Sequence, residues 1–371
     1  MPSSTSSSER PCAIERDTEP PQACRALERA PVGDWTKAWV ATLLGVVILL
    51  AGWEAVCRLG GYEPSFQSDG RLWAMARQRA SNADSDCIAL VGSSRVLLNL
   101  DLDTVEEITG RSAVQLGVNG CTPLPFLVEL AADVSFTGLV LCGVAPAFFF
   151  DQHALNSRRF AEFYAAYQEF GVSPAQRFDQ FLVTAAQDSL AFRHPALAPS
   201  RLVAAVQEGA WPAVPWVRVR GDRDQFGDFE HAAPGYFAHQ ARFYESKKKP
   251  ATPGQLASAL TIIELSVKRI RERGGEVVFV RFPTQGQVGA SERRRFPREK
   301  YWNSLASMTA GVALHADDYP SLKSFRFPDG SHLDYRDAPR FTRELIRIVA
   351  AELVTRGDKR LAEATRRDSR G

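Results

Sequence analysis

Residues 87–95 read C-I-A-L-V-G-S-S-R, and this stretch decides the fold that we predict. Its first five residues are almost wholly apolar, and Gly92, Ser93 and Ser94 follow at once. A short apolar run bounded by turn residues is typical of a strand buried on both faces of a parallel sheet. Ligands of such sheets bind just beyond the carboxyl ends of the strands. We therefore expect Ser94 at the mouth of a crevice, where it can act as a nucleophile if a base reaches it.

Strand-like and helical segments alternate on both sides of this stretch. Further apolar runs predict four more strands, at residues 112–116, 138–144, 276–282 and 312–315. Helical patterns separate these runs, which is the signature of a parallel α/β sheet. We predict an α/β domain over residues 70–355 with a five-stranded parallel sheet of order 2-1-3-4-5. In that order the carboxyl ends of all five strands open along one edge.

Capping signals support two of the helices. Asp103 and Glu106 form a D-x-x-E capping box that opens a short helix, which Gly110 ends. Thr252 and Gln255 form a second box at the start of a longer amphipathic segment. Both segments are expected to be helical.

The α/β pattern is interrupted between the third and fourth strands. Residues 156–170, 174–192 and 200–209 have helical spacing, whereas residues 211–250 are polar and loop-like. We interpret residues 147–250 as a helical insertion that forms a cap or lid beside the sheet.

An apolar segment at residues 35–58 is long enough to cross a bilayer core of roughly 30 Å as one helix. Trp35 and Trp39 near its start and Trp53 near its end suit the two membrane interfaces. A buried core helix is the alternative, but no apolar partner follows for many residues. Basic residues are more frequent before the segment than after it. This bias favours a cytoplasmic N-terminus, an extracytoplasmic main domain and single-pass anchoring in the cell membrane.

Both ends of the chain are polar. Residues 1–34 are rich in Ser, Pro, Glu and Arg and predict a disordered cytoplasmic tail, and residues 356–371 predict a charged C-terminal tail. The net charge is only +2, so the chain lacks the excess of basic residues that is typical of proteins that bind nucleic acid. The six cysteines contain no C-x-x-C pair, so we expect neither a zinc nor a redox motif, no metal and no cofactor.

The sequence F-P-D-G-S-H-L, which contains Asp329 and His332, lies between the fifth strand and the closing helix. An Asp three residues before a His on a Gly-containing turn can hold the imidazole in one tautomer while its other nitrogen removes a serine proton. Asp329 and His332 are therefore the candidate acid and base for Ser94. Asp334 and Asp337 are nearby alternatives to Asp329.

These residues together resemble the SGNH/GDSL hydrolase superfamily, whose members place a serine after strand one, a glycine after strand two and D-x-x-H near the C-terminus. The resemblance spans roughly residues 85–355 and implies a three-layer, flavodoxin-like α/β fold. It matches Ser94 to the nucleophile, and Asp329 and His332 to the last block. Three residues of the G-V-N-G turn after strand two match the second block and become candidate oxyanion residues: Gly117, Asn119 and Gly120.

One block of the family pattern is missing. The usual G-x-N-D after strand three is replaced by G-V-A-P at residues 143–146. The oxyanion would then depend on the backbone N–H groups of Ser94 and of Gly117 or Gly120, together with Asn119. Removing one such donor typically costs about 2.7–4 kcal/mol of transition-state stabilisation. The departure therefore bears on the efficiency of ester hydrolysis more than on the fold.

A G-S-S turn and a D-x-x-H behind one N-terminal membrane helix are most similar to one subgroup of this superfamily. The subgroup includes the teichoic acid D-alanine-transfer protein and polysaccharide O-acetyltransferases, which work beside a multi-spanning membrane-bound O-acyltransferase. The resemblance implies acyl transfer to or from a hydroxyl group of a cell-surface glycan or polymer through an acyl-serine on Ser94. It also implies a multi-spanning acyltransferase as partner.

Each candidate residue has a structural alternative. Ser94 can instead be a helix N-cap, and the G-V-N-G residues can form a plain turn. Arg95 can bind an anionic acceptor or acyl donor, or it can form a structural ion pair. His315 and Asp317, at the end of the fifth strand, are expected to be structural.

Two other classes of function stay open. A non-catalytic member of the superfamily would use the crevice to bind glycan or to position a partner enzyme. A flavodoxin-like module would bind a phosphate-bearing ligand at the Gly92 turn. The sequence contains neither G-x-x-x-x-G-K-S/T nor G-x-G-x-x-G, which argues against the phosphate-binding alternative.

Overall fold

The computed structural model describes residues 35–82, 87–170, 174–233, 235–236, 249–357 and 361. The chain divides into two units, Met1–Ala55 and Val56–Gly371, and each is considered by itself. The tail expected at residues 1–34 lies outside the described residues, as does most of the tail expected at residues 356–371.

The described part of the first unit is helical. It belongs to helix α2 (Trp35–Leu59), which continues into the first residues of the second unit. By length and composition α2 can cross a membrane, and nearly all of its apolar side chains are exposed. Its bounds differ by one residue from the expected segment, residues 35–58.

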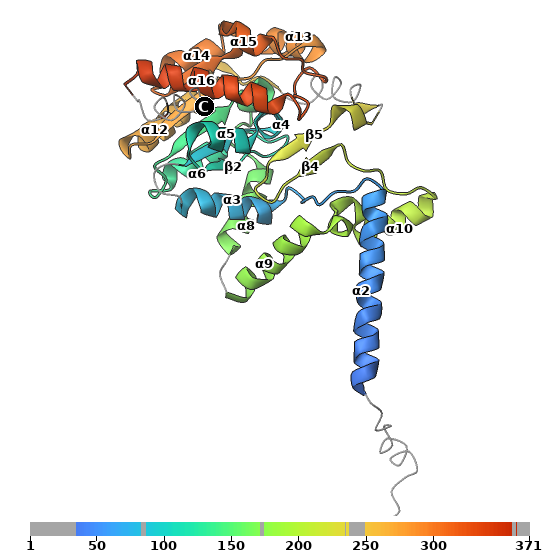
Figure 1. Ribbon diagram of the computed structural model, residues 1–371. Helices are drawn as coiled ribbons and strands as arrows, with labels where there is room; N and C mark the ends of the chain where they lie inside the picture. Colours follow the sequence, from blue (N-terminus) through green and yellow to red (C-terminus); the bar gives the residue numbers. More distant parts are fainter. Residues whose placement is uncertain are drawn as a thin grey trace, which may run out of the picture. The chain divides into compact units, whose positions relative to one another are not determined.

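A five-stranded parallel sheet forms the centre of the second unit (Figure 1). Its strands are β1 (Ile88–Val91), β2 (Ala113–Gln115), β3 (Leu139–Gly143), β6 (Glu276–Arg281) and β7 (Val312–His315). The order along the sheet is β2-β1-β3-β6-β7, in which Ile88 of β1 lies opposite Ala113 on one side and Leu139 on the other. This numbering differs from the expected 2-1-3-4-5 because two strands that the sequence did not reveal lie between β3 and β6.

Those two strands form an antiparallel hairpin, β4 (Val217–Val219) with β5 (Gln225–Gly227), inside the insertion. The expectation of a purely helical and loop-like insertion was therefore wrong. Each strand has only three residues and carries little apolar periodicity, so most of the hairpin's stability must come from tertiary contacts. Its turn is closed by the Arg220 amide, which donates to the Asp224 carbonyl at 2.9 Å.

Helices and short 3₁₀ segments fill the rest of the described second unit. The helices are α3 (Gly70–Asn82), α4 (Ser94–Asn99), α5 (Leu102–Thr109), α6 (Leu124–Ala132), α7 (Pro146–Phe149), α8 (Arg158–Glu169), α9 (Pro174–Ser189), α10 (Pro199–Glu208), α12 (Pro253–Glu272), α13 (Gly286–Arg295), α14 (Trp302–Met308), α15 (Pro320–Lys323) and α16 (Ala338–Thr355). The 3₁₀ segments are η1 (Ala191–Arg193), η2 (Pro195–Leu197), η3 (Phe229–His231) and η4 (Ala316–Asp318).

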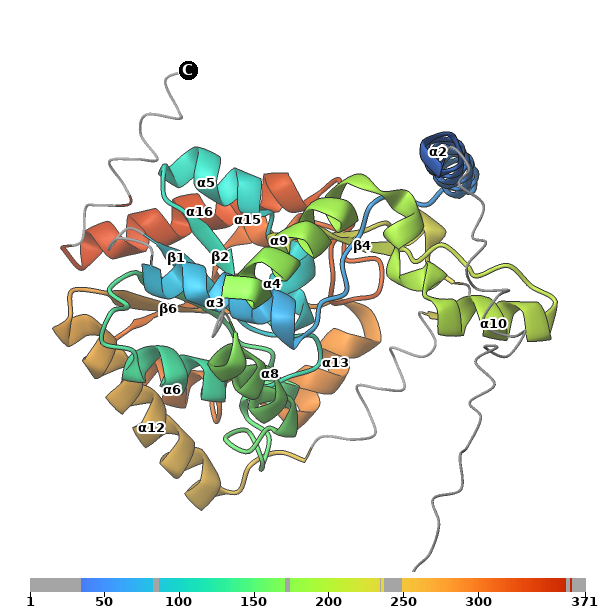
Figure 2. The same cartoon turned by 90° about the horizontal axis from the view of Figure 1, so that it is seen from below.

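The sheet lies between two helical layers, as Figure 2 shows for α5 and α16 on one side and α6 and α12 on the other. Strand β1 supplies both cores, because successive side chains of a strand point to opposite faces. Ala89 and Val91 pack in the core beneath α3, α6 and α12, whereas Ile88 and Leu90 pack in the core beneath α5 and α16. The α/β domain with a five-stranded parallel sheet that the apolar runs predicted is confirmed, and helices cover both faces of the sheet.

Helix caps agree with the sequence in one case and differ in the other. Thr252 and Gln255 form the expected capping box of α12. Helix α5 is capped by Asp101, whose Oδ1 accepts from the Thr104 amide at 2.7 Å, and not by the expected Asp103. Asp103 lies in the first turn and pairs instead with Arg220 of the hairpin turn, at 2.6 Å.

Candidate active site

The turn from β1 into α4 places Ser94 at the carboxyl edge of the sheet. Gly92 is required there, because a Cβ on this residue would lie 2.2 Å from Val96 Cγ2. Ser93 occupies the N-cap position without a side-chain capping bond, and Ser94 is the first helical residue. The alternative in which Ser94 caps the helix is therefore wrong, and its hydroxyl is available for another partner.

That partner is His332, which lies 238 positions away in the chain. Its Nε2 is 2.8 Å from Ser94 Oγ, and its Nδ1 is 2.6 Å from Asp329 Oδ2. All three side chains are buried. With the proton on Nδ1, the imidazole donates to the carboxylate and accepts from the serine hydroxyl. This is the Ser-His-Asp arrangement of a serine nucleophile activated by a general base.

The loop that carries the acid and the base is fixed by its own backbone. Asp329 Oδ1 accepts from the Ser331 amide at 2.8 Å and from the His332 amide at 2.7 Å. Gly330 between them has φ +80°, in the left-handed region that favours glycine. Burial alone would raise the pKa of Asp329. The adjacent His332 and these hydrogen bonds outweigh burial and lower that pKa, so the carboxylate stays ionised at neutral pH.

A fourth side chain, Tyr236, contacts this group, although no sequence motif pointed to it. Its hydroxyl donates to Asp329 Oδ2 at 3.2 Å, the same oxygen that faces the imidazole. The Tyr236 ring packs against Trp216 and Phe229 with centroid distances of 4.6 and 6.2 Å. The hairpin region of the insertion therefore helps to hold the Asp329 carboxylate.

Arg95 follows the serine but does not face a substrate. Its side chain is buried, and its Nη2 lies 2.6 Å from Glu292 Oε1. Its Nε donates to Ser331 Oγ at 2.9 Å, and Ser331 lies in the D-x-x-H loop. Of the two alternatives for Arg95, these contacts favour the structural ion pair over a binding role, because the guanidinium is already held by protein groups. The ion pair joins the serine helix to α13, and the hydrogen bond to Ser331 Oγ connects the serine helix to the histidine loop.

Glu292 of α13 is the centre of this buried network. It also accepts from Arg281 Nη2 at 2.5 Å, so one carboxylate serves two buried guanidinium groups. Burial would raise the pKa of Glu292, but the charges of Arg281 and Arg95 outweigh it and lower that pKa. Removing one partner of such a buried pair leaves an uncompensated charge, which is strongly destabilising.

The candidate oxyanion residues are only partly brought to the serine. Gly117 lies beside the serine turn, since a Cβ on it would be 3.4 Å from the Gly92 carbonyl oxygen. Its amide donates to Gln115 Oε1 at 3.0 Å. Asn119 and Gly120 are exposed, and no hydrogen bond joins either to the Ser-His-Asp group within the described ranges. The Ser94 amide is at the first position of α4, where a helix N–H has no intrahelical partner.

Arg223, in the hairpin turn, holds the Gly117 segment from outside the sheet. It is fully buried, with φ +77°, and its Nε and Nη2 donate to the carbonyls of Gln115 and Gly117 at 3.1 and 2.5 Å. Its Nη1 has no hydrogen-bond partner in the described part of the chain. Burial lowers the pKa of this guanidinium to about 9. The positive φ and the burial of a charged group both cost stability, and at this position they hold the Gln115 and Gly117 carbonyls in place.

The remaining acidic and histidine candidates lie elsewhere. Asp334 Oδ2 accepts from the Phe229 amide at 3.0 Å, so this carboxylate positions the insertion and not the imidazole. His315 Nδ1 accepts from the Asp317 amide at 3.2 Å, as expected for a structural role. Burial, together with nearby guanidinium charges, lowers the pKa of His315 to about 4, so the ring is neutral at pH 7.

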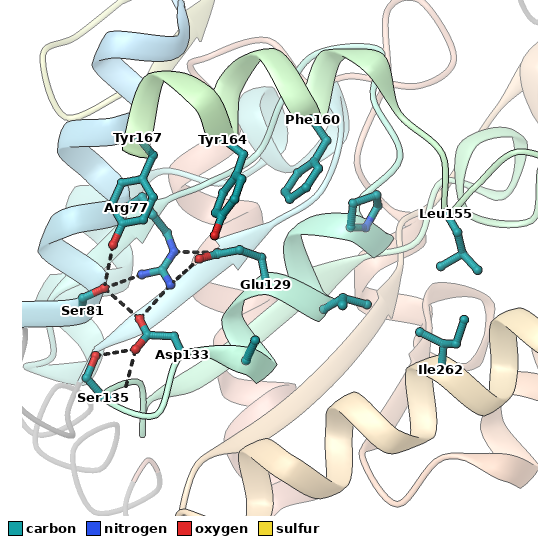
Figure 3. A pocket seen from close by; sticks show the side chains of 13 residues that line it. Arg77, Ser81, Glu129, Asp133, Ser135, Leu155, Phe160, Tyr164, Tyr167 and Ile262 are labelled. Atoms are coloured by element: carbon teal, nitrogen blue, oxygen red, sulfur yellow. Dashed lines mark hydrogen bonds and ion pairs between the residues drawn. The ribbon is translucent and has the colours of Figure 1, made fainter. Parts of the chain in front are cut away.

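A cavity of about 750 Å³ lies away from this site. It lies between α6, α8 and α12, and Figure 3 shows its polar end and its apolar end. At the polar end Arg77 donates to Glu129 and Asp133 at 2.7 Å each, and Ser81 also donates to Asp133. Two carboxylates therefore hold one guanidinium, and we assign this cluster a structural role in joining α3 to α6.

Comparison with known proteins adds nothing to this geometry. No protein-family model matches the sequence, and no curated protein is significantly similar to it. The functional interpretation therefore depends on the Ser-His-Asp group.

Proposed function

We propose that this chain is a membrane-anchored serine acyltransferase or esterase of the SGNH type. Its flavodoxin-like α/β domain would act on O-acyl groups of a cell-surface glycan or polymer. The observation that carries the proposal is the chain of contacts from Ser94 Oγ through His332 to Asp329, at 2.8 and 2.6 Å. The parallel sheet supports it, because the serine follows β1 at the edge where such sheets bind ligands.

In the proposed reaction, Ser94 Oγ attacks the carbonyl carbon of an acyl donor while His332 Nε2 accepts the hydroxyl proton. The tetrahedral oxyanion lies against the Ser94 amide. Collapse expels the donor's alcohol, which takes the proton back from His332, and leaves an acyl-serine. A sugar hydroxyl or water then gives its proton to His332 and attacks the acyl group. Collapse of this second intermediate breaks the bond to Ser94 Oγ, which takes the proton back from His332, and releases the acylated sugar or the free acid. Asp329 stays ionised throughout and stabilises the transient imidazolium.

The location of the domain is part of the proposal. Helix α2 meets the length and hydropathy of one membrane span. Basic residues cluster on its N-terminal side, so we propose a cytoplasmic N-terminus and an extracytoplasmic active site. A multi-spanning membrane-bound O-acyltransferase would then be the source of the acyl group. Protease added outside intact cells should cleave the main domain if this orientation is right.

A fluorophosphonate probe tests the chemistry. The full-length protein should be labelled on Ser94, and Ser94→Ala should abolish labelling. Ser93→Ala is the matched control, because Ser93 is a neighbour that is also buried and has no side-chain capping bond, and this variant should label like the wild type. Labelling that survives Ser94→Ala would refute the proposal.

One observation favours a second candidate, a non-catalytic glycan-binding or scaffolding protein. The Gly117 amide is engaged by Gln115 Oε1 and does not face a substrate oxygen, which leaves the oxyanion with few donors. This candidate predicts that the folded wild-type protein is not labelled at Ser94 at any probe concentration. It also predicts that Ser94→Ala binds glycan as the wild type does.

A further inference from the structure

Two helices of the insertion, α9 and α10, expose apolar faces. None of their described side chains is buried. In Figure 1 both lie below the α/β layers. Helices of soluble domains normally bury such a face, so an exposed one marks a surface that another apolar phase covers.

The exposed face of α9 is continuous. Phe178, Phe181 and Leu182 are separated by three and one positions, which places them on one side of the helix. Phe178 is 63% exposed and Phe181 is 67% exposed. On α10, Val203 and Val206 likewise share one side, and Val206 is 83% exposed. The two helices together present a surface of aromatic and branched aliphatic side chains.

The segment between α9 and α10 is fixed to the last residues of α2 that belong to the second unit. Arg58 Nη2 donates to the Ser189 carbonyl, the last residue of α9, at 2.9 Å. A small buried cluster joins the same two parts of the chain, and its members are Cys57, Tyr62, Ala191, Ala196 and Leu197. The exposed apolar faces are therefore tied to the point where the apolar segment of α2 ends.

We propose that α9 and α10 lie in the headgroup boundary of the bilayer that α2 crosses. This inference depends on α2 as the membrane anchor, which is part of the proposed function, and not on the chemistry of Ser94. We favour a bilayer as the apolar phase that covers α9 and α10, because the membrane anchor of the same chain tethers both helices near a bilayer surface in every molecule. Amphipathic helices bury their apolar face at this depth and keep the opposite face in water.

The neighbouring residues fit this environment. Trp211, just after α10, is 56% exposed, and tryptophan is enriched at membrane interfaces because its ring is apolar and its N–H is polar. Arg193 and Arg201 are exposed next to the two helices, where guanidinium groups can pair with lipid phosphates. Asp179 of α9 is also exposed, and it lies about 100° around the helix from Phe178, outside the apolar face.

Photolabelling from lipid tests the inference on the full-length chain. The protein is reconstituted into liposomes of phosphatidylcholine and phosphatidylglycerol that contain a phosphatidylcholine with a diazirine near its headgroup. Illumination is followed by peptide mapping with mass spectrometry. We expect lipid adducts on peptides of α2, α9 and α10. Peptides of α12 should carry none, although Leu265 of that helix is also exposed.

A pair of matched double variants identifies the surface. Phe178→Gln with Phe181→Gln should reduce adducts on α9 to the level of α12 and leave those on α2 unchanged. Val134→Gln with Leu265→Gln replaces apolar side chains of similar exposure outside the insertion and should change nothing. All four positions are exposed, so none of these changes removes core packing.

Two results would overturn the inference. Adducts on α2 without adducts on α9 and α10 would show that the apolar faces meet another protein, including a second copy of this chain. Failure of lipid to label α2 would remove the anchor and the inference with it. Fluorophosphonate labelling of Ser94 in the same liposomes is measured separately, so loss of the proposed chemistry is distinguishable from loss of the membrane contact.

Discussion

Replacing Asp329 by Asn should abolish most of the reactivity of Ser94 while the protein stays folded. In the native site Asp329 Oδ1 accepts two backbone amides, so the Asn side chain must keep its oxygen there. Its NH₂ group then faces His332 Nδ1, which can only accept. The imidazole proton moves to Nε2, opposite Ser94 Oγ, and the ring can no longer take the serine proton.

The size of this effect follows from the tautomer. The corresponding substitution in Ser-His-Asp proteases lowers the rate by about 10⁴-fold, or about 5.5 kcal/mol of activation free energy. The cost in stability is smaller, because the shape and the two backbone hydrogen bonds are retained. We expect about 1–3 kcal/mol from one mismatched buried hydrogen bond. Reactivity should therefore fall far more than the free energy of unfolding.

The assay is the second-order rate of fluorophosphonate labelling, measured beside thermal unfolding. Asp334→Asn is the matched control, because this nearby carboxylate contacts the Phe229 amide and Arg336 and not the imidazole, and its labelling rate should stay close to that of the wild type. Tyr236→Phe removes one donor from Asp329 Oδ2 and should cost at most about tenfold. An Asp329→Asn variant that labels within about tenfold of the wild type would refute the assigned role of the carboxylate.

Three further changes test the supporting structure. Glu292→Gln leaves two buried guanidinium groups without their shared carboxylate and should lower the free energy of unfolding by about 3–5 kcal/mol, whereas Arg298→Met, at a surface pair, should lower it by no more than about 1 kcal/mol. Equal urea midpoints for the two would contradict the network. Arg223→Gln should lower the free energy of unfolding by about 2 kcal/mol, because the Gln115 and Gly117 carbonyls lose their donors. An unchanged urea midpoint would count against the hairpin contact. The free energy of unfolding should fall as the pH is lowered from 6.5 toward 4, because His315 binds a proton in the unfolded chain in this range but stays neutral in the folded protein. His315→Gln should remove about 1–2 kcal/mol of that pH dependence.

The sequence was most informative where one type of residue is needed for a particular backbone turn or side-chain pairing. The apolar run at Cys87–Val91 and the glycine after it predicted strand β1 and the serine turn, and the D-x-x-H spacing predicted the pairing of Asp329 with His332. Both signals are local. Their convergence could be expected because the strand order directs both loops to one edge of the sheet.

What the sequence missed depends on contacts between distant segments. Tyr236 reaches Asp329 from 93 positions away, and Arg223 reaches Gly117 from 106 positions away. Neither residue lies in a motif, and the three-residue strands that position them have no readable period. The role of Arg95 could not be decided between ligand binding and an ion pair, because its partner, Glu292, lies 197 positions away on a helix that the sequence did not predict.

The most direct measurement is the mass of the protein during turnover of an activated acetyl ester. On mixing and rapid acid quench, the wild type should gain one acetyl group, and peptide mapping should place it on Ser94. His332→Ala should gain none on the same timescale. An acetyl group on another residue, or equal acetylation of Ser94→Ala, would contradict the claim that Ser94 forms the acyl-enzyme.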